Sequence, residues 1–230
     1  MLELLNISKF YGNDHTRRDV LKDISLTIER SDTIAIIGPS GSGKSTLLNI
    51  MGTLDTPDSG IVKFNGLEIH SLGEPALADI RNRHIGFMFQ LHHLLPQLNL
   101  IENVLLPVLP QKDKALYKKA LARAMDLLQI VGLSDKINQF PGQMSVGECQ
   151  RTAIVRALIN EPELILADEP TGSLDQESAE QLGDLLLDIK KKLAVAIIVV
   201  THSSSLAKRM SSIYKLSDGK LLPFTEQDKF

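Results

Sequence analysis

The chain has 230 residues, 43% of them hydrophobic, so it is long enough to bury the core of one domain. Its formal net charge of −3 gives no basic footprint for nucleic acid, and its single cysteine excludes a disulfide framework and fits a reducing compartment. No apolar run reaches the length that a bilayer requires and the first residues show no signal-peptide pattern, so we expect a protein that works in the cytoplasm.

The first predicted elements are strands with one buried face. Apolar residues alternate with polar ones at Leu2 and Leu4 and again over residues 24–28. Residues 61–64 predict another strand, which enters a turn at Asn65-Gly66. These segments favour a small antiparallel β subdomain.

The most informative segment follows the apolar, β-branched run Thr33–Ile37, which predicts a buried parallel strand. The segment fits the phosphate-binding pattern G-x-x-x-x-G-K-[ST] with Gly38, Pro39, Ser40, Gly41, Ser42, Gly43, Lys44 and Ser45. Residues 45–51 predict a helix that ends at Gly52. A strand, a glycine loop and a helix start aim backbone N–H groups and the helix dipole at a phosphate. We expect Lys44 to reach the β- and γ-phosphates and the Ser45 hydroxyl to bind Mg²⁺. The alternative is a glycine-rich turn that matches the pattern by chance.

Later segments alternate between helical and strand patterns. A helix with one apolar face is predicted over residues 112–131, and Gly132 follows it as a stop. Strands are predicted over 164–167 and 196–201, an amphipathic helix over 179–193, and a hairpin at Asp218-Gly219. This alternation predicts an α/β fold with a parallel-sheet core. We expect a single domain over 1–230, with a helical lobe of about 91–160 inserted into a core lobe of about 1–90 and 161–230.

Two carboxylates, Asp168 and Glu169, follow the apolar run 164–167. Ligands of such sheets bind at the carboxyl ends of the strands, so both side chains would lie beside the phosphate loop. We expect Asp168 to hold Mg²⁺ through water and Glu169 to orient and deprotonate the attacking water. A pair of acids that solvates a loop is the alternative. These two motifs alone leave kinases, GTPases, helicases and motor ATPases open.

Residues 144–151, with the sequence MSVGECQR, resemble the signature L-S-G-G-[QE]-x-Q-R of ATP-binding-cassette (ABC) ATPases. Further motifs of that family follow in its order over essentially the whole chain, at Tyr11, Gln90, Ser173-Leu174-Asp175 and Thr201-His202. The resemblance implies the fold of a P-loop NTPase, hydrolysis of ATP, and ATP and Mg²⁺ as cofactors. This sequence departs from the family pattern at two positions. Val146 replaces the first signature glycine, and Ser203 stands where an aspartate is usual.

The resemblance also implies roles for particular residues. Tyr11 would stack on the adenine, His202 would contact the γ-phosphate and act with Glu169 in catalysis, and Gln90 would bind Mg²⁺ together with Ser45 and Asp168. The residues that bind ATP are implied to be Tyr11, the phosphate loop 38–45, Thr46, Ser145, Gly147, Glu148 and Asp175. Ser145 and the backbone N–H of Gly147 would lie at the start of a helix, where they would form a second anion site. In the family this site completes the pocket of a second copy, which implies a homodimer that encloses two ATP molecules.

Residues 52–60, 89–96 and 200–210 narrow the resemblance to the group that contains lipoprotein-releasing, macrolide-export and cell-division ABC ATPases. This implies a peripheral subunit on the cytoplasmic face of the inner membrane, bound to integral permease subunits and not to nucleic acid, that powers lipoprotein release. The alternatives are export of a macrolide, peptide or glycolipid, or a regulatory ATPase of the cell-division kind. An ABC protein of DNA repair or translation is disfavoured because no coiled-coil insertion or basic face is predicted. Leu94-Leu95-Pro96 would contact the membrane partner or, as the alternative, pack inside the helical lobe.

Overall fold

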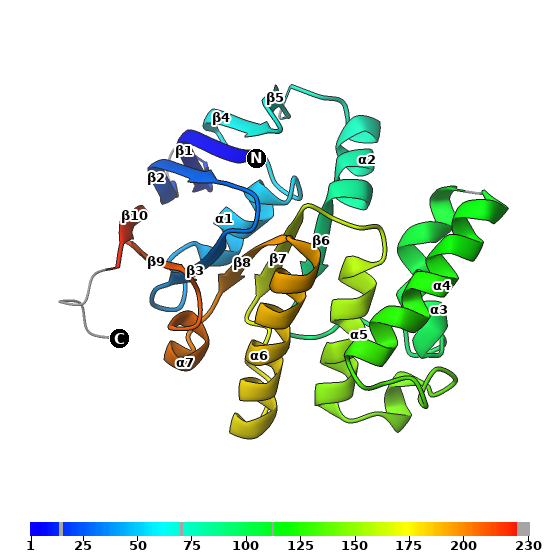
Figure 1. Cartoon of the computed structure of the whole chain (residues 1–230). Helices are drawn as coiled ribbons and strands as arrows, with labels where there is room; N and C mark the ends of the chain where they lie inside the picture. The colour runs from blue at the N-terminus through cyan, green and yellow to red at the C-terminus, as the bar shows by residue number, and fades with distance from the viewer. Residues whose placement is uncertain (14–15, 70, 112, 225–230) are drawn as a thin grey trace.

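The computed structural model describes residues 1–13, 16–69, 71–111 and 113–224, whose strands form two sheets (Figure 1). The first sheet has the order β2-β1-β4-β5 and is antiparallel throughout. Its strands are β1 (Leu2–Tyr11), β2 (Arg18–Ile28), β4 (Ser59–Phe64) and β5 (Leu67–Glu68). The predicted antiparallel sheet is confirmed, and the turn at Asn65 and Gly66 joins β4 to β5 with a positive φ at both residues. β1 runs further than its first apolar residues indicated and carries Tyr11 at its end.

The second sheet has the order β10-β9-β3-β8-β7-β6. Its strands are β3 (Thr33–Ile37), β6 (Ile85–Met88), β7 (Leu164–Asp168), β8 (Ala196–Val200), β9 (Ser212–Ser217) and β10 (Lys220–Pro223). All neighbours pair in parallel except β10, which forms the predicted hairpin with β9 across Asp218 and Gly219. β3 and β8 are buried along their whole length, because both faces of the sheet are covered.

The two faces of the parallel sheet belong to different hydrophobic clusters. Ile36, Leu166 and Ile198 pack with the antiparallel sheet and with the helix α1 (Lys44–Met51). The alternate strand residues, such as Ile165 and Ile197, pack with four other helices. Those helices are α3 (Leu100–Leu105), α4 (Lys114–Ile130), α5 (Val146–Leu158) and α6 (Gln176–Leu193). The predicted α/β architecture with a parallel-sheet core is therefore confirmed.

The helices between β6 and β7 lie together on one side of the molecule, to the right of the parallel sheet in Figure 1. They include the short 3₁₀ helices η1 (Leu106–Gln111) and η2 (Pro141–Gln143). α5 contacts β6 and shares its cluster with the sheet, so the helical segment is continuous with the core. The lobe boundaries near residues 90 and 160 stay a prediction.

The predicted boundaries differ from the observed ones by a few residues. α4 begins at Lys114, because the Asp113 carboxylate accepts the Ala115 N–H at 2.7 Å as its N-cap, and Lys112 lies outside the described residues. α6 begins three residues before the predicted start, β7 includes Asp168, and β8 ends at Val200. The helices α2 (Glu74–His84) and α7 (Ser204–Ala207) and the strand β6 were not predicted from the sequence. No helix in the described ranges combines the length and the apolar character that crossing a membrane requires.

Candidate functional site

The phosphate loop 38–45 joins β3 to α1, and its glycines are required by its geometry. Gly38, Gly41 and Gly43 have φ values of 156°, 74° and 101°, which other residues rarely adopt. A Cβ on Gly38 would collide with the carbonyl oxygen of Leu216, and one on Gly43 would lie 2.7 Å from a Val20 methyl group. The N-cap residue of α1 is Gly43, which has no side chain to bond the first N–H groups of the helix, so these groups are available to a phosphate.

Lys44 lies inside this loop and is only 6% exposed. Its ammonium donates hydrogen bonds to the carbonyl oxygens of Gly38 and Pro39, both at 3.0 Å, and lies 3.3 Å from His202 Nε2. Burial lowers the pKa of Lys44, while the charges of Glu169 and Asp168 act in the opposite direction. The predicted phosphate-binding cation therefore lies between the loop and the acidic pair.

Glu169 and His202 meet at the carboxyl ends of β7 and β8. The Glu169 N–H donates to the Val200 carbonyl at 2.9 Å, and its φ of 46° is uncommon for a residue with a side chain. Glu169 Oε2 accepts the His202 backbone N–H at 3.1 Å. Oε1 lies 3.4 Å from His202 Nε2 and is buried without a hydrogen bond from any described residue. Both predicted catalytic residues are thus in contact, next to Lys44.

The three predicted Mg²⁺ ligands surround this cluster from separate elements. Ser45 is exposed at the start of α1, Asp168 ends β7, and Gln90 is exposed two residues after β6. The Gln90 side-chain nitrogen lies 3.0 Å from the point where a Cβ on Gly172 would lie, so Gly172 leaves it room beside the acidic strand. A hydroxyl, a carboxylate and an amide oxygen form the hard oxygen donor set that Mg²⁺ prefers, so these residues fit the ion.

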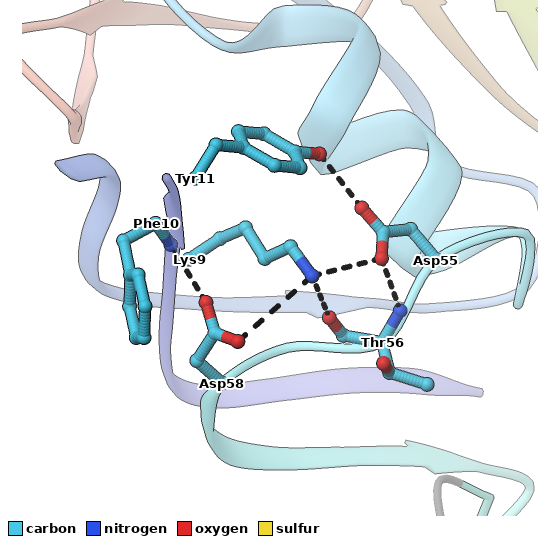
Figure 2. Close-up of polar contacts among 6 residues, drawn as sticks. All are labelled: Lys9, Phe10, Tyr11, Asp55, Thr56 and Asp58. Carbon is cyan, nitrogen blue, oxygen red and sulfur yellow. Dashed lines mark hydrogen bonds and ion pairs between the residues drawn. The ribbon is translucent and has the colours of Figure 1, made fainter. Parts of the chain in front are cut away.

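Tyr11 borders a pocket of about 350 Å³ beside the phosphate loop, together with Gly43, Ser45 and Thr46. The side chain is 47% exposed, and its hydroxyl donates to Asp55 Oδ2 at 2.8 Å (Figure 2). The predicted adenine-stacking residue is therefore next to the predicted phosphate-binding residues.

The signature segment starts α5 with a reciprocal cap. The Glu148 N–H donates to Ser145 Oγ at 3.3 Å, and the Ser145 N–H donates to Glu148 Oε2 at 2.8 Å. The Lys136 ammonium contacts the other Glu148 oxygen; its hydrogen bond and the one from Ser145 hold the pKa of Glu148 below its ordinary value. Val146 is 49% exposed in the first turn of the helix.

Asp175 caps the neighbouring helix α6. Its carboxylate accepts the Ser178 N–H at 2.9 Å and the Ser178 hydroxyl at 2.7 Å, and these bonds lower the pKa of Asp175. A Cβ on Gly147 would lie 3.7 Å from Ser178 Oγ, so the starts of α5 and α6 lie side by side. Ser145, Gly147, Glu148 and Asp175 thus form a second group of site residues. Within the described chain, no hydrogen bond joins this group to Lys44, Glu169 or His202.

Two polar residues of α5 form hydrogen bonds to the segment after β6. The sequence analysis assigned no role to either of them. Gln150 is fully buried, and its side-chain nitrogen donates to the carbonyl oxygens of Phe89 at 3.2 Å and Gln90 at 2.9 Å. Arg156 donates to the carbonyl oxygens of His92 and His93, both at 2.7 Å. Polar side chains on the buried face of a helix were the available signal. α5 therefore links the signature segment to Gln90.

Comparison with known proteins agrees with this geometry. The family model described as ABC transporter matches residues 21–172, which include the phosphate loop, the signature and the acidic pair. The lipoprotein-releasing system ATP-binding protein LolD of Geobacter metallireducens is 47% identical over 222 residues, covering 96% of this chain and 98% of the relative. The LolD protein of Syntrophus aciditrophicus is 45% identical over 226 residues, with coverages of 96% and 99%.

Among solved structures, a dimeric ATP-binding cassette in a post-hydrolysis state, bound to ADP and Pi, superposes with a TM-score of 0.87. It is 36% identical, and the superposition covers 100% of both chains. The predicted fold of a P-loop NTPase of the ABC ATPase type is therefore confirmed. The chain belongs to the ABC transporter family and is one of its ATPase subunits.

Proposed function

We propose that two copies of this chain bind Mg²⁺ and ATP between them, on the cytoplasmic face of the inner membrane, and power lipoprotein release through integral permease subunits. The observation that carries the proposal is the geometry of Glu169 beside Lys44. One carboxylate oxygen is held by the His202 N–H, and the other is buried without a hydrogen-bond donor from the described residues. A carboxylate in this state is free to accept a proton from a water molecule.

The proposed mechanism assigns a separate task to each group. Lys44 and the free N–H groups of α1 bind the β- and γ-phosphates, and His202 contacts the γ-phosphate while it orients Glu169. Glu169 aligns and deprotonates the attacking water. Mg²⁺ would be held by Ser45, Gln90 and Asp168 and would supply positive charge for the phosphoryl oxygens.

The second group of site residues supports the homodimer. Ser145 and Gly147 begin a helix, where backbone N–H groups and the dipole favour an anion, and the comparison structure is dimeric. In the proposed dimer they complete the pocket of the opposite copy, together with Glu148 and Asp175. Because ADP lacks the γ-phosphate, hydrolysis followed by release of the phosphate removes a contact that bridges the two copies and lets them separate.

A groove on the α5 side supports attachment to a permease. It has a volume of about 490 Å³ and lies between α2, the segment after β6 and α5. Its lining includes Leu54, Phe87, Phe89, His93, Pro107 and Arg156. Close to it in the chain, Leu91 is 67% exposed and Leu95 is also exposed, whereas Leu94 is buried in the lobe. Large exposed apolar side chains and an apolar groove are both typical of a docking surface for a short helix. A movement of this groove would shift Gln90 through the hydrogen bonds that Gln150 and Arg156 donate to the segment after β6.

The cargo proposal is supported by the LolD relatives at 45–47% identity over nearly the whole chain. Reconstitution tests it directly. The chain is co-purified with its integral permease subunits, placed in proteoliposomes, and supplied with ATP and a membrane-anchored lipoprotein. We expect ATP-dependent lipoprotein release. Movement of a macrolide, peptide or glycolipid instead, or ATP hydrolysis without any cargo movement, would contradict this cargo and favour the export or regulatory alternative.

A further inference from the structure

The Tyr11 side chain is held by a charged cluster that lies outside the phosphate loop (Figure 2). Lys9 and Tyr11 are two residues apart on β1, so their side chains point to the same face and both meet Asp55. Asp55 Oδ2 accepts the Tyr11 hydroxyl at 2.8 Å, and Oδ1 accepts the Lys9 ammonium at 2.9 Å and the Thr56 N–H at 2.7 Å. Both carboxylate oxygens are therefore in use.

Lys9 is buried although it is charged, and its surroundings compensate for that burial. Besides Asp55, its ammonium donates to the Thr56 carbonyl oxygen at 2.7 Å and lies 4.0 Å from Asp58 Oδ1. Burial acts to lower the pKa of Lys9, but the hydrogen bond and charge of Asp55 outweigh it and raise that pKa. Lys9 Nζ also lies 5.3 Å from the centroid of the Tyr11 ring, so the cation is positioned against the aromatic ring.

The cluster connects the Tyr11 ring to the helix that starts at the phosphate loop. Asp55 follows α1, and the N–H groups of Leu54 and Asp55 donate to the Asn49 carbonyl at 2.8 and 3.3 Å. α1 therefore carries Lys44 and Ser45 at its first turn and, just past its last turn, the carboxylate that holds Tyr11. This arrangement fixes the ring relative to the phosphate loop, across the pocket that both border.

We propose that Asp55, assisted by Lys9, is a positioning residue for recognition of the nucleotide base, because it locks the Tyr11 ring in the orientation that forms one wall of the pocket. The inference rests on the proposed function, since a fixed base wall matters only if the pocket holds a nucleotide. Asp55 does not touch the base; it acts through the Tyr11 hydroxyl. A pre-organised ring loses less rotamer freedom when the base binds, so the cluster raises affinity for the base part of the ligand alone.

The test compares a ligand with a base to one without it. Calorimetric affinities for ATP and for inorganic triphosphate are measured in Mg²⁺ for the unmodified chain, Asp55→Ala, Asp55→Asn and Tyr11→Phe. We expect Asp55→Ala to weaken ATP binding about tenfold, as loss of one charge-assisted hydrogen bond does, and to leave inorganic triphosphate binding unchanged. Tyr11→Phe keeps the ring but not the hydroxyl and should weaken ATP binding similarly. Asp55→Asn keeps an acceptor for that hydroxyl and should recover part of the affinity.

Two further measurements separate positioning from folding. In the Tyr11→Phe background, Asp55→Ala should cost almost no additional ATP affinity, because the bond between them is already absent. Asp79→Asn is the matched control, since Asp79 is an exposed aspartate that pairs with Arg83 on α2, outside the charged cluster, and it should keep the ratio of the two affinities. The inference would be overturned if Asp55→Ala and Asp55→Asn weakened the binding of ATP and of inorganic triphosphate equally. Additive losses of ATP affinity in the double variant would also overturn it. Absence of ATP binding in the unmodified chain would instead contradict the proposed function.

Discussion

The Glu169 carboxylate is fixed by a neighbour from another strand: it accepts the His202 backbone N–H at 3.1 Å, while the His202 ring nitrogen Nε2 lies 3.4 Å from its other oxygen. Because the orienting bond comes from the main chain, the carboxylate stays oriented even when the imidazole moves toward a phosphate. The position that a base needs is thus built into the end of β8.

Replacing Glu169 by glutamine removes the base and keeps a side-chain oxygen that can accept the His202 N–H. We expect the turnover number to fall by about 10²–10⁴-fold, the usual contribution of a general base, with ATP affinity retained. ATP should then accumulate at the site and hold two copies together. Steady-state ATPase assays and size-exclusion chromatography with and without ATP measure both effects.

Glu161→Gln is the matched control for this variant. Glu161 is exposed, lies before β7 rather than after it, and pairs only with Lys119 and Arg123 among the described residues. It should leave turnover unchanged. Near-normal hydrolysis by the Glu169→Gln variant, with a monomer in ATP, would contradict the proposed role.

Lys44→Ala should strongly reduce the affinity for ATP. In the proposed site the buried ammonium would face the phosphates, and charged hydrogen bonds of this kind support a loss of about 100-fold in affinity. Calorimetry with ATP measures the loss, and thermal unfolding checks that the variant still folds without the two bonds to the loop carbonyls. An unchanged affinity in a folded variant would refute the phosphate-loop assignment.

The fold could be predicted from the sequence where burial leaves a pattern. β3 and β8 are recognisable because strands covered on both faces are almost wholly apolar: Thr33 is the one polar residue among the ten residues of the two strands. α2 gives no such pattern, since it buries only Leu77 along its length. β6 is four residues long and contains Gly86, which packs against the Ala157 carbonyl, so its glycine looks like a turn rather than a strand.

The residues of the candidate site also differ in whether the sequence could predict them, depending on how local their signal is. The positions of Lys44 and Glu169 could be predicted because their signals are local: Lys44 lies in the glycine loop after one apolar strand, and Glu169 directly follows another. Asp55 could not be predicted, because its proposed role depends on contacts with Lys9 and Tyr11, which lie on β1, 46 and 44 positions earlier in the chain. Gln150 was missed for the same reason: its carbonyl partners lie 61 and 60 positions earlier in the chain.

The ion pair between Lys136 and Glu148 should make stability depend on pH. The pKa of Glu148 is lowered in the folded chain, so the stabilisation is complete above the unfolded value of about 4.3 and is lost as the pH falls through the lower folded value. We expect Lys136→Met to reduce the free energy of unfolding by about 1 kcal/mol at pH 7, and we expect this difference to shrink progressively below about pH 4. Urea unfolding at several pH values measures it.

Lys119→Met is the control for that series, since Lys119 forms a longer, exposed pair with Glu161 at 3.6 Å. It should change the free energy of unfolding by less than about 0.5 kcal/mol at every pH. A loss in Lys136→Met that stays constant down to pH 3 would mean that the lysine stabilises the chain by packing, not through the Glu148 charge.

Val146→Gly restores the glycine that ABC signatures usually carry. The valine is half exposed, and the cap of α5 uses Ser145 and Glu148 instead, so removing the side chain leaves no cavity and breaks no hydrogen bond. We expect the ATPase rate at saturating ATP to be maintained or raised, because the change removes a branched side chain that would lie next to the partner's nucleotide in the proposed dimer. The stability cost of a glycine in the first helical turn should stay below about 1 kcal/mol. Val146→Ala separates the two effects, since it removes most of the bulk without adding backbone freedom. A steep fall in ATPase rate in both variants, with unfolding curves unchanged, would mean that the valine makes a productive contact across the dimer.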